Sequence, residues 1–183
     1  KKNGFLGLRA PKQYGGLSFS FQAQSIILGK IASRSLDAST IVEVPNSLGP
    51  DELIEKYGTK EQKDTYLPRL ARGKEIPAFA ITSPTGGTDA AAMRDVGYIA
   101  YDLYKGKKIL GIRLTWDKRY ITFAPNATLI VLTFHLFDSG NLLGKEKDIG
   151  ITLALIPSHH SGVEIGRRHL VGGAGENGSP QQC

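Results

Sequence analysis

The stretch Pro77-Ala78-Phe79-Ala80-Ile81-Thr82-Ser83-Pro84-Thr85-Gly86-Gly87-Thr88-Asp89 separates two halves of the sequence that follow different patterns. Before it, apolar residues recur at helical spacing, and after it short runs of β-branched and aromatic residues alternate with turns. The adjacent glycines Gly86 and Gly87 allow backbone N–H groups to converge on a closely approaching ligand, such as a phosphate. From composition alone, an ordinary turn after a strand is the simpler explanation, and the stretch matches neither a Walker loop nor the GxGxxG pattern.

Residues 1–76 predict an α-helical segment. The first helix is indicated by residues at helical spacing, namely Phe21, Ser25, Leu28, Ile31 and Ala32. Pro50 suits the first turn of a second helix, where its missing N–H would be unpaired in any case. Thr59 and Gln62 have the spacing of a capping box at the start of a third helix. Pro68 lies inside that third helix, and we expect it to kink or split the helix.

Residues 77–183 predict a β-domain. Short strands separated by turns favour an antiparallel barrel or sandwich over alternating βαβ units. The predicted strands are Val96–Tyr104, Ile109–Thr115, Tyr120–Phe123, Thr128–Phe137, Ile149–Ile156 and Val163–Ile165. The fold class is therefore α+β, an N-terminal α-helical segment followed by an antiparallel β-barrel or sandwich.

The composition excludes several classes of protein. Lys and Arg total 23 against 17 Asp and Glu, for a net charge of +6 among 183 residues. This excess would attract nucleic acid, anionic lipid or a polyphosphorylated small molecule, and an ordinary solvated surface explains it equally well. It is spread along the chain rather than gathered on a basic face with exposed aromatics, which disfavours nucleic-acid binding. The single cysteine, Cys183, excludes an internal disulfide and favours a reducing, cytoplasmic compartment.

Several further motifs occur in a fixed order around the central stretch. They are Pro45–Pro50, Tyr57–Lys63, Tyr66–Gly73, Leu114–Thr122 and Gly162–Arg168. Together with Phe79–Asp89 they resemble the acyl-CoA dehydrogenase family, most closely its long bacterial members used in fatty-acid β-oxidation. The resemblance runs from about Gly4 to His169, and the last fourteen residues match poorly.

The resemblance implies an N-terminal helical domain, a middle β-domain and a C-terminal helical bundle. Residues 1–76 would form part of the first domain and residues 77–183 the second, with the bundle absent, so we expect the sequence to be a piece of a longer protein. The implied activity is the FAD-dependent α,β-dehydrogenation of a fatty acyl-CoA to the trans-2-enoyl-CoA. The glutamate that removes the α-proton belongs to the bundle in this family. We therefore expect no catalytic residue in this sequence and no activity from the chain alone.

The resemblance implies seven FAD-binding residues: Phe79, Ile81, Thr82, Gly87, Thr88, Tyr120 and Thr122. Phe79 and Ile81 would lie along the isoalloxazine, and Thr82 would hydrogen-bond its pyrimidine side. Gly87 and Thr88 would approach the pyrophosphate, and Thr88 would also contact the CoA of the substrate.

Tyr120 would pack against the flavin ring, although many relatives have tryptophan at this position, and Thr122 would donate to the N5 region. Without the resemblance, Phe79, Ile81 and Tyr120 are ordinary core residues and Thr122 an ordinary strand residue. An electron-transfer flavoprotein would accept the electrons, and the complete protein would be a homo-oligomer. Membrane association at the inner membrane is compatible with the long bacterial relatives, but no residue here argues for it.

Other readings stay open at this point. An acyl-CoA oxidase has the same fold and passes its electrons to oxygen, and a non-catalytic flavin- or acyl-CoA-binding fragment is a further alternative. His135 is expected to be a core or cross-strand polar residue. His159-His160 lacks a third ligand at a recognisable spacing, so no metal site is predicted. Glu52 and Glu55 are expected on a helix surface, and Arg167-Arg168 on an exposed rim.

Overall fold

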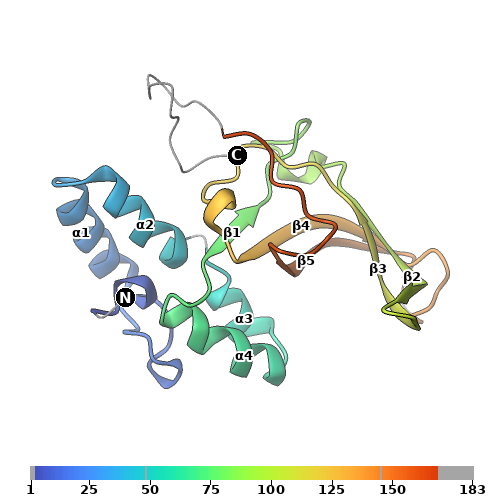
Figure 1. The fold of residues 1–183 in the computed structure, drawn as a ribbon, viewed down its shortest axis with the longest axis horizontal. Helices are drawn as coiled ribbons and strands as arrows, with labels where there is room; N and C mark the ends of the chain where they lie inside the picture. Colours follow the sequence, from blue (N-terminus) through green and yellow to red (C-terminus); the bar gives the residue numbers. More distant parts are fainter. Residues whose placement is uncertain (1–2, 48, 145, 169–183) are drawn as a thin grey trace. The chain divides into compact units, whose positions relative to one another are not determined.

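The computed structural model describes residues 3–47, 49–144 and 146–168 (Figure 1). The described chain forms two compact units. The first contains the described parts of Lys1–Phe79, Thr122–Ile130 and Ile156–Cys183, and the second those of Ala80–Ile121 and Val131–Leu155. The domains 1–76 and 77–183 stay a prediction, and Cys183 lies outside the described residues.

Four helices follow two short 3-10 turns, η1 (Phe5–Gly7) and η2 (Lys12–Tyr14), in the first unit. The helices are α1 (Phe21–Ala32), α2 (Leu36–Ser47), α3 (Asp51–Tyr57) and α4 (Lys60–Ala71). The side chain of Ser20 caps α1 by accepting a hydrogen bond from the N–H of Ala23 at 3.2 Å. The hydroxyl of Ser39 in α2 donates to the carbonyl of Leu28 in α1 at 3.2 Å, so a polar contact joins the two helices.

The capping box predicted for the last helix is confirmed. The N–H of Gln62 donates to the Thr59 hydroxyl at 3.2 Å, and the Gln62 side chain accepts from the Thr59 N–H at 2.9 Å. Pro68 does not split this helix, because α4 continues through it to Ala71, and the expected kink stays a prediction. Leu67, Leu70 and Ala71 are buried around the proline, and this packing holds the last turn in place.

Helix α2 had no predicted counterpart in the sequence. It contains Pro45, and its serine and threonine residues weaken the intrinsic helical signal. Tertiary contacts favour it instead, because Val42 and Val44 are buried and Asn46 makes three hydrogen bonds. The Asn46 amide group donates to the carbonyls of Val42 and Phe5 at 2.7 and 2.8 Å, and its oxygen accepts from the Arg9 N–H at 3.2 Å.

Five strands form one sheet in the order β1-β4-β2-β3, with β5 also paired to β4. They are β1 (Pro77–Ala80), β2 (Val96–Tyr104), β3 (Lys107–Thr115), β4 (Leu129–Phe137) and β5 (Asp148–Pro157). The α+β class is confirmed, but the sheet is not closed into a barrel. It is also mixed rather than antiparallel: β2 and β3 form an antiparallel ribbon, whereas β2 and β4 pair in parallel from Val96↔His135 to Tyr98↔Phe137.

Two predicted strands are absent. Residues 120–123 form no continuous strand, because Tyr120 and Phe123 have left-handed backbone conformations with φ of 59° and 70°. Such φ values interrupt the extended backbone that a ladder requires. Residues 163–165 have no strand either, although Val163 and Ile165 are the residue types that favour one. Both segments contain the β-branched or aromatic residues that favour a strand, but their backbone forms a loop.

Hydrogen bonds of Thr128 tie residues 122–130 to the first, mainly helical unit. The N–H groups of Thr128 and Leu129 donate to the carbonyl of Ile76 at 2.8 and 3.2 Å, and the N–H of Ile76 donates to the Thr128 hydroxyl at 2.8 Å. That hydroxyl also donates to Glu75, whose carboxylate pairs with Arg69 of α4 at 2.5 Å. The chain therefore returns to the end of the helical segment after passing through the second unit.

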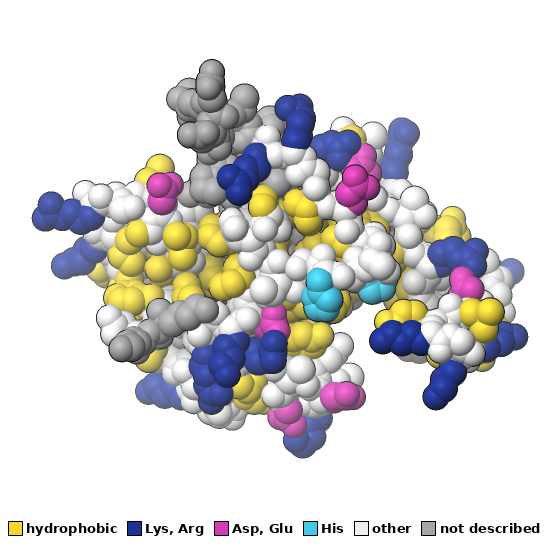
Figure 2. All heavy atoms as spheres, in the orientation of Figure 1, with side chains coloured by type: hydrophobic (Ala, Val, Ile, Leu, Met, Phe, Trp, Pro, Cys, Tyr) yellow, Lys and Arg dark blue, Asp and Glu magenta, His cyan; other side chains and the backbone are white. Residues whose placement is uncertain are grey.

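The basic excess forms no single patch on the face drawn in Figure 2. Lys and Arg side chains stand there in several separate groups, with Asp and Glu side chains between them. This agrees with their even distribution along the sequence. None of the described helices combines the length and apolar character needed to cross a lipid bilayer.

Asp51 generates a testable pH dependence of stability in the first unit. It is the first residue of α3 and is buried, and loss of hydration raises its pKa from an ordinary 3.8 to about 6. Between about pH 4 and pH 6 the unfolded chain loses this proton while the folded chain keeps it. The free energy of unfolding should therefore fall by about 3 kcal/mol as pH rises through this window. Chemical denaturation of the wild type and Asp51→Asn at pH 4 and pH 7 should show this loss only in the wild type.

Glu61→Gln supplies the control, because Glu61 is an exposed carboxylate in α4. The difference in the free energy of unfolding between Glu61→Gln and the wild type should be the same at pH 4 and pH 7. If the free energies of unfolding of the wild type and Asp51→Asn differed by the same amount at pH 4 and pH 7, burial would not raise the pKa of Asp51 as described.

Candidate functional site

The loop that follows β1 begins with a tight turn. The N–H of Ser83 donates to the carbonyl of Gly86 at 2.9 Å, and the N–H of Gly86 donates back to the carbonyl of Ser83 at 3.3 Å. A Cβ at residue 86 would come within 3.1 Å of the Asp89 carbonyl oxygen and 3.2 Å of the Met93 nitrogen. The first glycine of the pair is therefore tightly packed against the backbone of residues 89–93.

The second glycine has a different environment. A Cβ at residue 87 would meet no atom within 4 Å, and Gly87 and Thr88 are both exposed. Within the described chain, neither their N–H groups nor the Thr88 hydroxyl forms a hydrogen bond. Two adjacent backbone donors, a hydroxyl and open space suit the binding of an anion such as a phosphate. Gly86 is therefore closely packed within the chain, whereas Gly87 faces open space.

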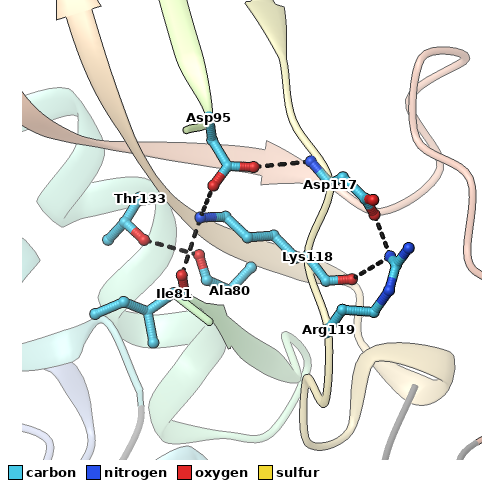
Figure 3. Close-up of polar contacts among 7 residues, drawn as sticks. All are labelled: Ala80, Ile81, Asp95, Asp117, Lys118, Arg119 and Thr133. Atoms are coloured by element: carbon cyan, nitrogen blue, oxygen red, sulfur yellow. Dashed lines mark hydrogen bonds and ion pairs between the residues drawn. The ribbon is translucent and has the colours of Figure 1, made fainter. Parts of the chain in front are cut away.

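Hydrogen bonds to three consecutive carbonyls fix the backbone that enters this loop, and their donors lie on β4 and on the segment after β3. The Ala80 carbonyl accepts from the buried Thr133 hydroxyl at 2.9 Å. The Ile81 carbonyl accepts from Lys118 Nζ at 3.0 Å, and Figure 3 shows both contacts. The next carbonyl, that of Thr82, accepts from the N–H of Arg119 at 3.0 Å. The peptide planes at the start of the loop are therefore held in one orientation.

The lysine in this set belongs to a buried ion pair. Lys118 Nζ lies 2.6 Å from Asp95 Oδ2, and the two side chains are only 2% and 3% exposed. The other carboxylate oxygen of Asp95 accepts from the N–H of Asp117 at 2.8 Å (Figure 3). Asp95 precedes β2 and Lys118 follows β3, so the pair lies at the base of the β2–β3 ribbon. Each buried charge is thereby satisfied by an opposite charge and by backbone groups.

Sequence reasoning missed Lys118 and Asp95. Lys118 lies in the run Asp117-Lys118-Arg119, which resembles a solvated surface segment, and Asp117 and Arg119 are indeed exposed and paired with each other. The available signal was Trp116, because an aromatic residue next to the run indicates partial burial. Side-chain periodicity along β3 does not extend into this irregular segment and could not identify which charge lies inside.

Five of the seven predicted flavin-binding residues belong to the second unit: Ile81, Thr82, Gly87, Thr88 and Tyr120. The first two lie at the carbonyls just described, and Tyr120 follows Arg119 directly and is 55% exposed. Phe79 and Thr122 belong to the first unit, and both are half-buried. The structure therefore joins Ile81 and Thr82 to the segment that carries Tyr120, and the seven assigned roles stay predictions.

A shallow cleft of about 240 Å³ opens on the second unit beside this loop. Ser83, Thr85, Arg94 and Trp116 are among the residues that line it. The Ser83 hydroxyl is buried and has no hydrogen-bond partner within the described residues. Loop residues therefore contribute to a concave surface as well as to the open donors at Gly87 and Thr88.

The remaining candidate residues have structural roles. His135 Nε2 lies 2.5 Å from Asp148 Oδ1 on the neighbouring strand and lowers the pKa of that carboxyl group, which confirms the expected cross-strand polar residue. The His135 ring also stacks on Phe137 at 4.6 Å between centroids. Glu52 and Glu55 are exposed on α3, as expected for a helix surface. Arg167 and Arg168 are exposed as well.

His159 and His160 are exposed, and Nδ1 of His160 accepts from the N–H of Gly162 at 3.0 Å. Across residues 3–47, 49–144 and 146–168, no three side chains of His, Cys, Asp or Glu gather as a metal site would require.

Comparison with known proteins identifies the family of the chain. Residues 1–74 match the family described as acyl-CoA dehydrogenase, N-terminal domain. The solved acyl-CoA dehydrogenase of Geobacillus kaustophilus superimposes on 99% of the chain with a TM-score of 0.71 and 25% identity. The chain belongs to the acyl-CoA dehydrogenase family.

Two further relatives in this family differ in the reactions or ligands that their names give. A 3-(aryl)acrylate reductase of Clostridium sporogenes is 35% identical over 167 residues, which is 91% of this chain. A glutaryl-CoA dehydrogenase of Mycobacterium smegmatis, solved in complex with FADH2, matches 92% of this chain with a TM-score of 0.67 and 25% identity. The chain spans 40% of the reductase, 39% of the glutaryl-CoA dehydrogenase and 43% of the Geobacillus enzyme.

Removing the ammonium of Lys118 should strongly destabilise the second unit. Lys118→Met leaves the Asp95 carboxylate buried without its partner, so we expect a loss of about 3–5 kcal/mol in the free energy of unfolding. Urea denaturation followed by circular dichroism measures this loss. Lys60→Met is the control, because Lys60 pairs with Asp64 on the exposed surface of α4 and should be replaceable at little cost. Equal stability of the two variants would show that the Lys118–Asp95 pair is not buried as described.

Proposed function

We propose that this chain contributes the flavin- and acyl-CoA-binding surfaces of an FAD-dependent acyl-CoA dehydrogenase. The observation that carries the proposal is the loop of the second unit, where the adjacent N–H groups of Gly87 and Thr88 are free of partners within the described chain. Membership of the family and the FADH2 complex of a relative support the choice of flavin as the ligand. The long bacterial fatty-acid type remains our preferred subclass, on the sequence motifs.

The residues of the loop fit such a cofactor. The open space at Gly87 admits a phosphate group, and the donors beside it complement the negative charge of a pyrophosphate. Tyr120 is an exposed residue, and we assign its aromatic ring to packing against the flavin ring. Thr82 carries a hydroxyl that no described residue binds, and we assign it to the pyrimidine side of the flavin. Phe79, Ile81 and Thr122 complete the proposed set.

In the proposed reaction a proton leaves the α-carbon of the thioester and a hydride leaves the β-carbon, which forms the C=C bond of the enoyl-CoA. When bound, FAD supplies the acceptor for the hydride. The residues of this chain hold and orient the cofactor, and Thr88 contacts the CoA moiety. We assign no described residue as the base, and we propose an electron-transfer flavoprotein as the final acceptor.

The reverse reaction is the second candidate. The similarity to a 3-(aryl)acrylate reductase over 91% of the chain favours it, because such an enzyme adds hydrogen across the same kind of C=C bond. Both reactions would use the same flavin-binding residues, so the described residues are compatible with either direction. An oxidase would use the same flavin-binding residues and would differ only in the access of oxygen to the reduced flavin.

The natural full-length protein tests the proposal directly. It should purify with bound FAD, and its yellow colour should bleach when a long-chain acyl-CoA is added without oxygen, because two electrons then reside on the flavin. Recovery of the colour on adding an electron-transfer flavoprotein would identify the acceptor, and rapid peroxide formation in air would favour an oxidase instead. A flavin that resists acyl-CoA but is reoxidised by a 3-arylacrylate after chemical reduction would favour the reductase. A protein that binds no flavin would refute the proposal.

Gly87→Ala separates flavin binding from folding. The added methyl group meets no atom of the chain, so the free energy of unfolding should change by less than about 0.5 kcal/mol. The methyl group occupies the space assigned to the phosphate, so the Kd for FAD should rise about tenfold in a fluorescence titration. Gly111→Ala in β3 is the matched control, since a Cβ there also has no neighbour within 4 Å, and it should leave both quantities unchanged. Unaltered FAD affinity in Gly87→Ala would remove the pyrophosphate from this position.

A further inference from the structure

The three carbonyls of Ala80, Ile81 and Thr82 are held by donors of different strength. The Thr133 hydroxyl and the Arg119 N–H are neutral donors, whereas Lys118 Nζ is a charged donor in a buried setting. Hydrogen bonds from charged groups are roughly twice as strong as neutral ones. The central carbonyl of the three, that of Ile81, is therefore the most firmly held.

Fixing the Ile81 carbonyl also fixes the next N–H group. In a trans peptide the C=O and the N–H of the same plane point in opposite directions. Because the Ile81 oxygen faces Lys118, the N–H of Thr82 faces away from Lys118. No described residue accepts a hydrogen bond from this N–H. The lysine thus fixes the direction of a backbone donor that lies next to the free Thr82 hydroxyl.

Asp95 holds the lysine in the orientation that this requires. Its Oδ2 lies 2.6 Å from Lys118 Nζ, while its Oδ1 is held by the N–H of Asp117. The Asp95 carbonyl accepts from the N–H of His135 at 2.9 Å, which ties the same residue to β4. The carboxylate is therefore anchored from two sides, and the ammonium has little freedom to move.

We propose that Lys118, oriented by Asp95, is a positioning residue that fixes the Ile81–Thr82 peptide and so presents the Thr82 N–H to the isoalloxazine of FAD. This inference rests on the proposed function, because FAD is the ligand that the donor would meet. It predicts that the pair controls binding of the flavin ring and leaves the phosphate-binding donors at Gly87 and Thr88 unaffected. A merely structural role would not distinguish between these two parts of the ligand.

The test uses the double variant Asp95→Asn/Lys118→Met in the natural full-length protein. The substitutions conserve volume and remove both buried charges together, which avoids leaving one of them unpaired. The asparagine retains an oxygen that can accept from the Asp117 N–H. Asp102→Asn/Arg113→Met is the control, because it also removes both charges of an ion pair, here an exposed one with a 2.7 Å contact on the β2–β3 ribbon.

Titrations with FAD and with ADP, which lacks the ring, measure the two parts of the ligand separately. The double variant should raise the Kd for FAD about tenfold and change the Kd for ADP by less than about twofold. The visible circular dichroism of bound flavin should change as well. Amide hydrogen exchange of the ligand-free protein should become about tenfold faster at Arg119 and Ser83, which close the hydrogen bonds around this peptide. The control variant should match the wild type in every measurement.

The outcomes distinguish this inference from the proposed function. Equal weakening of FAD and ADP binding, or unchanged exchange at Arg119 and Ser83, would overturn the positioning role. If the wild type binds no FAD, the proposed function fails, and the exchange rates alone then decide whether the pair fixes this peptide. Should the double variant fail to fold, Lys118→Arg keeps a positive charge beside Asp95 but moves the donor that holds the Ile81 carbonyl. It should raise the Kd for FAD about threefold and leave the Kd for ADP unchanged, and an unchanged Kd for FAD would then refute the inference.

Discussion

The ammonium of Lys118 and the carboxylate of Asp95 meet at 2.6 Å with almost no exposure to solvent, and the candidate site depends on this contact. Neither charge would be stable in the interior without the other, so the residues before β2 and after β3 are held together. The remaining hydrogen-bonding capacity of the ammonium is used on the Ile81 carbonyl. An interaction needed to satisfy buried charge thereby also fixes the backbone at the entrance to the loop.

The loop itself combines a fixed part with an open part. The carbonyls of Ala80, Ile81 and Thr82 accept hydrogen bonds, and Gly86 is packed tightly against backbone atoms of residues 89–93. Gly87 and Thr88, directly afterwards, are exposed and have free donors within the described chain. A rigid frame next to accessible donors is the arrangement that a binding site requires, because little conformational entropy is lost when a ligand arrives.

The family relationship also has a physical basis in the described chain. The capping box at Thr59 and Gln62 and the loop at Phe79–Asp89 are local features, and the sequence motifs that resemble the family coincide with them. The differences from expectation lie where distant segments meet. Thr128 returns to Ile76, and β2 pairs with β4 in parallel, so the sheet neither closes into a barrel nor stays antiparallel.

The sequence by itself determined the features that depend on neighbouring residues: the α+β class, the starts of α3 and α4, most strands and the position of the glycine loop. It did not reveal α2, whose stability comes from the burial of Val42 and Val44 and the hydrogen bonds of Asn46. It also suggested a strand at residues 120–123, where left-handed backbone at Tyr120 breaks the pattern. Only the tertiary structure decided that Lys118 is buried while its charged neighbours are exposed. The reason is that the partner which makes its burial possible, Asp95, lies 23 residues away and meets it only when β2 and β3 pair.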